Sequence, residues 1–141
     1  MIYVSLRYNF ERRSQKMFKK YNPKEKSSCL ELAYCKLPNK SNIKKITNIS
    51  HIPFNAEDSL YVVALPFIKD FIEEYDDIFT GGTYQNLESG PVDVCGLNYY
   101  NPELTNQIID KVRTQKPKEY ELLLNWLENS KQYNGFYILG F

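Results

Sequence analysis

The segment Gly135–Phe141 (GFYILGF) places the tightest constraint on how this 141-residue chain can fold. It is apolar at nearly every position, and it is too short to form a buried helix. A strand of this kind fits only the interior of a sheet that other elements cover on both faces. The segment therefore predicts a layered fold in which helices pack on a sheet.

Alternating apolar and polar residues predict the other strands. Residues 2–8 and residues 30–35 each place apolar side chains on one face, which is typical of strands that cover a core. A short strand is expected around Val92–Val94. Residues 38–55 are irregular in pattern, with one more short strand indicated around Ile46–Ile49.

Apolar residues at helical spacing predict helices elsewhere in the chain. Residues 9–22 predict a basic helix that ends before a proline. Asn101 is a good N-cap for a second helix, which takes Pro102 into its first turn. A third helix opens at Pro117 and ends near Gly135.

Residues 55–79 allow two interpretations. The preferred one is a single helix that Asn55 caps, that Pro66 kinks and that Gly81-Gly82 stops, because the apolar residues stay in phase across the proline. The alternative is a strand at Leu60–Ala64, since this part is rich in Val and Tyr.

The predicted order is strand, helix, strand, irregular segment, helix, strand, helix, helix and strand. This order predicts a mixed α/β-type (α+β) fold in one domain over residues 1–141. We expect a mixed sheet of roughly four strands, with three to four helices packed on it. An apolar content of 43% is enough for a real core and argues against disorder.

The net charge of +1 hides a strong segregation of charge along the chain. Residues 1–50 carry 12 Lys and Arg and three acids, whereas residues 51–103 carry one Lys and ten acids. Segregation of this size indicates either that the two parts face each other in the fold or that one of them faces a charged partner.

No residue pattern predicts a catalytic, metal or cofactor site. His51 is the only histidine, and no motif around it or around a Cys or Ser fits a nucleophilic site. Gly81-Gly82 follows a predicted helix instead of preceding one, so a phosphate-binding loop is not indicated. The sequence therefore predicts a protein that is not an enzyme and that uses no cofactor or metal.

Two other functions stay open at this point. A nucleic-acid-binding module would use Arg12, Lys16, Lys19 and Lys20 of the basic helix to contact phosphates, although the near-neutral charge of the whole chain argues against it. A small metal-dependent nuclease would need Glu31 and Asp93 to converge.

The chain is expected to be cytoplasmic and to have no membrane partner. No apolar run reaches the length of a membrane span, and the first residues lack the layout of a signal peptide. The three cysteines form no CxxC pair, which is typical of reduced thiols in the cytoplasm.

The C-terminal half of the chain resembles bacterial immunity proteins of polymorphic toxin–immunity pairs, such as those of contact-dependent growth inhibition. The resemblance lies in the stretches LESGPVDVCGLNYYNPELTNQIIDKV and LLNWLENSKQYNGFYILGF, together with small size, a dense acidic helix and 12 tyrosines. It implies an inhibitor whose partner is a cognate toxin C-terminal domain, and many such toxins are nucleases with a basic substrate cleft. Immunity proteins share no single fold, so the resemblance assigns no individual residue.

The acidic residues between 70 and 88 are the candidates for the contact with such a toxin. An inhibitor with clustered acids and exposed tyrosines would imitate phosphates, associate quickly and hold its partner through desolvated aromatic contacts. A homodimer in which basic and acidic faces complement each other is also left open. The predicted partner-binding residues are Asp70, Glu73, Glu74, Asp76, Asp77, Tyr84 and Glu88.

Overall fold

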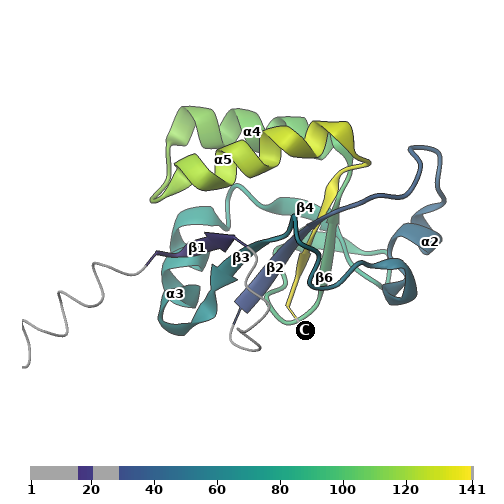
Figure 1. Ribbon diagram of the computed structural model, residues 1–141, viewed down its shortest axis with the longest axis horizontal. Coiled ribbons are helices and arrows are strands. Elements are labelled where there is room, and N and C mark those ends of the chain that lie inside the picture. The colour runs from purple at the N-terminus through teal and green to yellow at the C-terminus, as the bar shows by residue number, and fades with distance from the viewer. Residues whose placement is uncertain (1–15, 21–28, 141) are drawn as a thin grey trace, which may run out of the picture.

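A computed structural model of the chain describes residues 16–20 and 29–140 (Figure 1). Within these residues, seven strands form one sheet in which every neighbouring pair is antiparallel. The sheet thus has more strands than the roughly four that were predicted, and it is antiparallel instead of mixed. In spatial order the strands are β1 (Phe18–Lys20), β3 (Leu60–Val63), β2 (Cys29–Tyr34), β7 (Phe136–Leu139), β6 (Leu97–Tyr100), β4 (Thr80–Thr83) and β5 (Ser89–Pro91).

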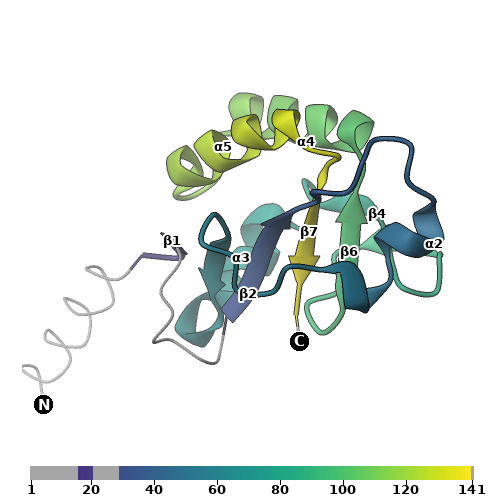
Figure 2. The ribbon, with the colours of Figure 1, turned by 45° about the vertical axis from the view of Figure 1, so that its right-hand side comes forward.

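Four α-helices and two 3₁₀ helices lie within the part of the chain that the structure describes. They are α2 (Ile43–Ile46), η1 (Ile49–His51), α3 (Ala64–Tyr75), α4 (Pro102–Gln115), α5 (Tyr120–Asn129) and η2 (Ser130–Gln132). The helices α3, α4 and α5 bury their apolar sides on one face of the sheet, and α4 and α5 lie side by side there (Figure 2). The segment that holds α2 and η1 covers part of the other face. The fold is therefore a mixed α+β domain, as predicted.

The prediction of an interior strand at the end of the chain is confirmed. β7 pairs with β2 on one side and with β6 on the other, and all four of its residues are buried. Phe136 and Ile138 pack in the core beneath the helices, whereas Tyr137 and Leu139 pack in the smaller core on the opposite face. Both faces of β7 are thus covered.

An aromatic cluster fixes α3 on the sheet. Phe71 stacks on Tyr75 with ring centroids 5.4 Å apart, and Tyr75 stacks on Phe79 at 5.9 Å. Phe18 of β1 meets Tyr75 edge-on at 5.5 Å. Each of these side chains is at most 3% exposed, so α3 sits on a well-packed base.

The preferred interpretation of residues 55–79 is wrong, and the alternative strand is right. Leu60–Val63 form β3, and α3 begins at Ala64. Pro66 is the third residue of α3, where its missing N–H is one of the donors that a helix leaves unpaired in any case. The proline therefore lies in the first turn of α3 and does not kink a longer helix.

The basic helix predicted over residues 9–22 is wrong in its described part. Phe18–Lys20 form β1, which pairs with β3 at an edge of the sheet. Phe18 is buried there, and Lys20 is exposed. The rest of that helix and the strand predicted over residues 2–8 lie outside the described residues.

The strand indicated around Ile46–Ile49 is also wrong, because short helices form there. The side chain of Asn42 accepts a hydrogen bond from the backbone N–H of Lys44 (2.7 Å) and thereby caps α2. The side chain of Asn48 accepts one from the N–H of Ser50 (3.0 Å) and caps η1.

Two expectations between residues 80 and 96 need correction. Gly81-Gly82 do not stop a helix but lie in β4, where a Cβ on Gly82 would stand 2.9 Å from the Tyr100 ring. The strand expected at Val92–Val94 lies a few residues earlier, at Ser89–Pro91. Gly82 is therefore explained by the close approach of the Tyr100 ring to the backbone of β4, and not by the end of a helix.

Candidate functional site

The exposed side of α3 carries part of the predicted site. Ile72 is 37% exposed although it is apolar, and the side chain of Glu73 beside it is 62% exposed. Asp76 and Asp77, directly after the helix, are exposed as well. We call Ile72, Glu73, Asp76 and Asp77 the acidic surface.

The acidic surface lies at the C-terminal end of α3, which has no basic residue in its last turn. A helix C-terminus carries a partial negative charge, so carboxylates there are disfavoured by a few tenths of a kcal/mol to about 1 kcal/mol each. Lys69 approaches Glu73 at 3.9 Å, but no ion pair within the described residues reaches Asp76 or Asp77. The Lys111 ammonium donates a hydrogen bond to the Asp77 backbone carbonyl (3.3 Å), so one cation stands beside these acids. The three carboxylates still outnumber Lys69 and Lys111, against the local preference of the helix.

Two of the predicted contact residues, Asp70 and Glu74, contact Lys118 within the fold. Glu74 accepts a hydrogen bond from the backbone N–H of Lys118 (3.2 Å), and Asp70 lies 3.9 Å from the Lys118 ammonium group. Lys118 belongs to the connection between α4 and α5. Asp70 and Glu74 thus tie α3 to that connection.

Tyr84 and Glu88 lie apart from the acidic surface. They border the turn between β4 and β5, whereas Asp77 precedes β4, so the two groups are at opposite ends of that strand. The Tyr84 hydroxyl donates a hydrogen bond to the Pro91 carbonyl, and the Tyr84 N–H donates one to the Glu88 carbonyl (2.8 Å). The structure therefore does not bring these two residues together with the acids of α3.

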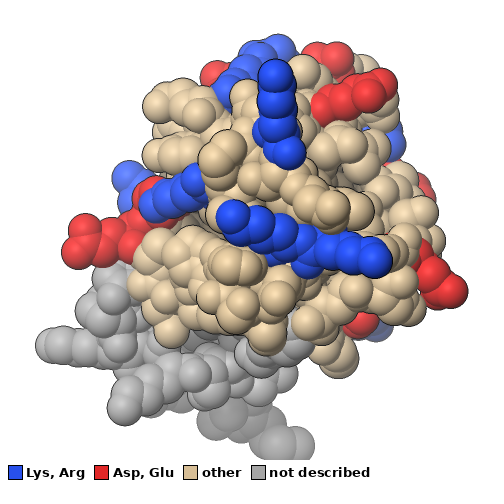
Figure 3. Space-filling model, turned by 90° about the vertical axis from the view of Figure 1, so that its right-hand side faces the viewer, with Lys and Arg blue, Asp and Glu red and all other residues tan. Residues whose placement is uncertain are grey.

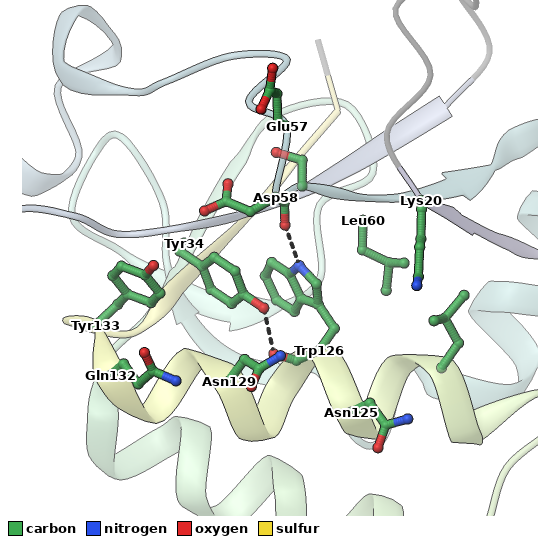
Figure 4. Close-up of a pocket in the computed structure, with 12 residues that line it drawn as sticks. Lys20, Tyr34, Glu57, Asp58, Leu60, Asn125, Trp126, Asn129, Gln132 and Tyr133 are labelled. Atoms are coloured by element: carbon green, nitrogen blue, oxygen red, sulfur yellow. Dashed lines mark hydrogen bonds between the residues drawn. The ribbon is translucent and has the colours of Figure 1, made fainter.

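A cleft that the sequence analysis missed lies between α5 and the strands β1, β2 and β3 (Figure 4). Its volume is about 490 Å³, within the range of small-molecule sites. Tyr34 is stacked between Trp126 and Tyr133, with centroid distances of 4.1 and 4.7 Å. The Trp126 indole donates to the Asp58 carbonyl (2.8 Å), and the Tyr34 hydroxyl donates to the Trp126 carbonyl (2.8 Å). These bonds hold the wall of the cleft in place.

Asp58 supplies the one buried polar side-chain atom, among the described residues, that lacks a hydrogen-bond partner, its Oδ1. Its Oδ2 pairs with the Lys36 ammonium at 2.8 Å. The carboxamides of Asn125, Asn129 and Gln132 line the opposite side of the cleft. The Asp58 Oδ1 is shielded from solvent, so the cleft presents polar groups to a ligand chiefly through these carboxamides.

The Tyr34 hydroxyl of the cleft does not titrate near neutral pH. Burial, with a smaller contribution from the charge of Asp58, raises the pKa of Tyr34 far above its ordinary value, so its hydroxyl stays protonated. His51 is exposed on η1 and does not line the cleft. Among residues 16–20 and 29–140, no three His, Cys, Asp or Glu side chains gather as a metal site would require.

Glu31 and Asp93, the pair considered for a metal-dependent nuclease, each stabilise a separate loop. The Glu31 carboxylate is buried and accepts hydrogen bonds from the Asn55 N–H (2.8 Å) and the Ser59 hydroxyl (2.7 Å). Asp93 lies in the turn before β6, where its Oδ1 accepts a bond from the Cys95 N–H (2.9 Å).

The buried carboxylate of Glu31 predicts a pH dependence of stability. Burial raises the pKa of Glu31 above its ordinary value of 4.5, and this outweighs the hydrogen bonds that lower it. The folded state then binds the proton more tightly than the unfolded state, so the free energy of unfolding falls as the pH rises from 4.5 through the raised pKa. We expect Glu31→Gln, whose amide oxygen can accept the same bonds, to lack this fall. Urea unfolding midpoints at pH 4.5 and at about pH 7 measure it, and an equal fall in both proteins would contradict the assignment.

Comparisons of the chain with known protein families, with curated proteins and with solved structures give no match. None of the helices within the described residues is both long and apolar enough to span a membrane.

Proposed function

We propose that this chain is an immunity protein, which binds and neutralises a cognate bacterial toxin domain and performs no reaction itself. The observation that carries the proposal is the acidic surface: an exposed isoleucine flanked by carboxylates at the end of a helix that disfavours them. Acids retained at a cost to stability are expected where a function needs them.

The acidic surface suits a toxin with a basic substrate cleft. The carboxylates and the negative end of α3 create one field of the same sign, which steers a basic partner and raises the association rate. Ile72 supplies the apolar contact that excludes water once the partner has arrived. Electrostatic attraction and an apolar anchor thus occur within six consecutive residues of the chain.

The base of α3 supports the same proposal. Phe71 and Tyr75 are fully buried, so the exposed residues between and after them are held in one geometry before binding. A surface that is already ordered loses little conformational entropy on association, which strengthens binding.

Charge reversal of the acidic surface tests the proposal. We expect the variant Glu73→Lys, Asp76→Lys, Asp77→Lys to bind the toxin about 100-fold more weakly and with less dependence on salt. We do not expect it to be less stable, because lysines suit a helix C-terminus better than acids do. Glu74 is left unchanged, since its carboxylate accepts the bond from Lys118. The partner to use is the product of the neighbouring toxin gene, and calorimetry at two salt concentrations measures the affinity.

A matched control reverses three other exposed acids, Glu57, Glu103 and Asp110, and so changes the net charge equally. We expect this control to bind the toxin nearly as tightly as the wild type. Similar losses in both variants would mean that only the total charge matters, and an unchanged affinity in the first would remove the acidic surface from the interface.

A further inference from the structure

A second exposed surface lies around α2. From residue 32 to residue 56 the chain carries four lysines and no acid. Figure 3 shows this side of the molecule, with Lys and Arg lying across its middle and Asp and Glu near its margins. Ile43 and Ile49 of this segment are 38% and 41% exposed, and Leu87 of the turn between β4 and β5 is 43% exposed. We call Lys40, Ile43, Lys44, Lys45, Ile49 and Leu87 the basic surface.

The basic surface contains a hollow of about 450 Å³. The segment around α2 lines one side with Lys44 and Ile49, and the turn between β4 and β5 lines the other with Leu87. Glu88 follows in the same turn, where its carboxylate accepts a bond from the Asn86 amide (3.3 Å). Ile49 and Leu87 are the two apolar residues of its lining, and the other lining residues besides Lys44 are polar: Thr47, Asn48, Gln85 and Asn86. The hollow thus offers two aliphatic contacts to an apolar side chain and a lysine to acids that flank it.

We propose that the basic surface binds the acidic surface of a second copy of this chain. Ile72 of one copy enters the hollow between Ile49 and Leu87 of the next. The carboxylates beside Ile72 then face the lysines of α2. This association needs no toxin, and so it goes beyond the proposed function.

Complementary charge and matching exposed apolar side chains both favour a second copy as the occupant of the hollow. Three of the five large apolar residues that are exposed in the described part of the chain are Ile43, Ile49 and Leu87, and a fourth is Ile72. A surface that only follows phosphates would not need three exposed aliphatic side chains, because its affinity comes from charge. A partner with both acids and an apolar anchor fits better, and the acidic surface has both.

The two surfaces belong to different parts of the chain, so the contact is heterologous. However many copies are added, one acidic surface stays free at one end of the assembly and one basic surface at the other. The assembly can therefore keep growing unless the copies close into a ring. Because the attraction is largely between exposed charges, salt weakens it. A bound toxin occupies the acidic surface and therefore breaks the association.

Sedimentation velocity on the full chain tests this inference. We expect the wild type to sediment as a mixture of species whose mean size grows with protein concentration at low salt and returns to the monomer at about 0.5 M salt. We expect one variant, Lys44→Glu with Lys45→Glu, to be monomeric. A second variant, Glu73→Lys with Asp76→Lys, is expected to be monomeric as well.

Mixing two variants, each of which lacks one of the two surfaces, gives the decisive result. Combined copies of two other variants, Lys44→Ala with Lys45→Ala and Glu73→Ala with Asp76→Ala, keep one intact acidic surface and one intact basic surface. We expect this pair to form dimers and nothing larger, since only one productive contact remains. A monomeric wild type at low salt would overturn the inference, and so would a mixture that fails to form dimers or single variants that still associate.

The same variants separate this inference from the proposed function. The variant Lys44→Glu with Lys45→Glu keeps the acidic surface, so we expect it to bind the toxin as the wild type does. Loss of self-association with retained toxin binding supports both proposals. If the wild type is monomeric but still needs Glu73 and Asp76 for toxin binding, only the self-association proposal is overturned.

Discussion

Replacing Gly135 with alanine is expected to lower the free energy of unfolding by about 3–5 kcal/mol, since overpacking adds to backbone strain. Gly135 has a φ of +78°, and a Cβ there would stand 2.0 Å from the Tyr100 carbonyl oxygen. Its own carbonyl accepts the Cys35 N–H at 3.0 Å. The clash is with main chain, which no rotamer change relieves, and it falls where β7 enters the sheet.

Gly81→Ala is the matched control for this prediction. Gly81 also has a positive φ, +83°, but the nearest atom to its added Cβ is a Leu104 methyl group at 3.6 Å. Only the backbone cost remains, so we expect a loss of about 1 kcal/mol. Urea unfolding followed by far-ultraviolet circular dichroism measures both variants. Equal losses of unfolding free energy in the two variants would show that the contact between Gly135 and the Tyr100 carbonyl adds nothing to the cost of the substitution.

Phe71→Ala is expected to cost about 3–5 kcal/mol of stability, the usual range for deleting a buried phenyl ring. Phe71 is fully buried and contacts the rings of Tyr75, Phe79 and Phe18, at centroid distances of 5.4, 5.9 and 6.4 Å. Its removal opens a cavity between α3 and the sheet. The unfolding midpoint in urea again gives the measurement.

The next residue of the same helix provides the contrast. Ile72→Ala removes an exposed side chain, so we expect it to cost less than about 1 kcal/mol of stability. We expect it to weaken toxin binding and self-association, since both proposals use Ile72 as an anchor. A large loss of stability in Ile72→Ala would mean that this side chain belongs to the core.

Elements with strong local signals could be predicted from the sequence. β2 and β7 were expected where they are found, the first from its alternation and the second from its continuous apolar run. The helix after Asn101 is also confirmed, and the Asn101 side chain accepts the Leu104 N–H at 2.8 Å. The following helix begins at Tyr120, three residues beyond the expected Pro117.

Elements that depend on distant partners could not be predicted. β1, β4 and β5 have three or four residues each, which is too short for a recognisable alternation, and they form because neighbouring strands offer hydrogen bonds. The error at residues 55–79 has a similar cause. Leu60 and Phe67 are both buried, one by pairing in the sheet and the other by helix packing, and this imitates the period of one long helix.

The candidate site was only partly within reach of the sequence. Its charge pattern pointed to the acids of α3, but the roles of Asp70 and Glu74 depend on Lys118, more than 40 positions away. The cleft depends on Tyr34 and Trp126, which meet across an even longer separation. The apolar residues around α2 gave no local signal, because their exposure is set by the tertiary fold.

The central place of β7 has a consequence for synthesis on the ribosome. β1, β2 and β3 form one side of the sheet, and β4, β5 and β6 form the other, while β7 alone joins them. Until residue 139 has left the exit tunnel, the nascent chain holds two partial sheets whose inner edges, on β2 and β6, have no partner. Open edges of this kind invite wrong pairing, and they stay open until β7 has emerged and paired with both of them.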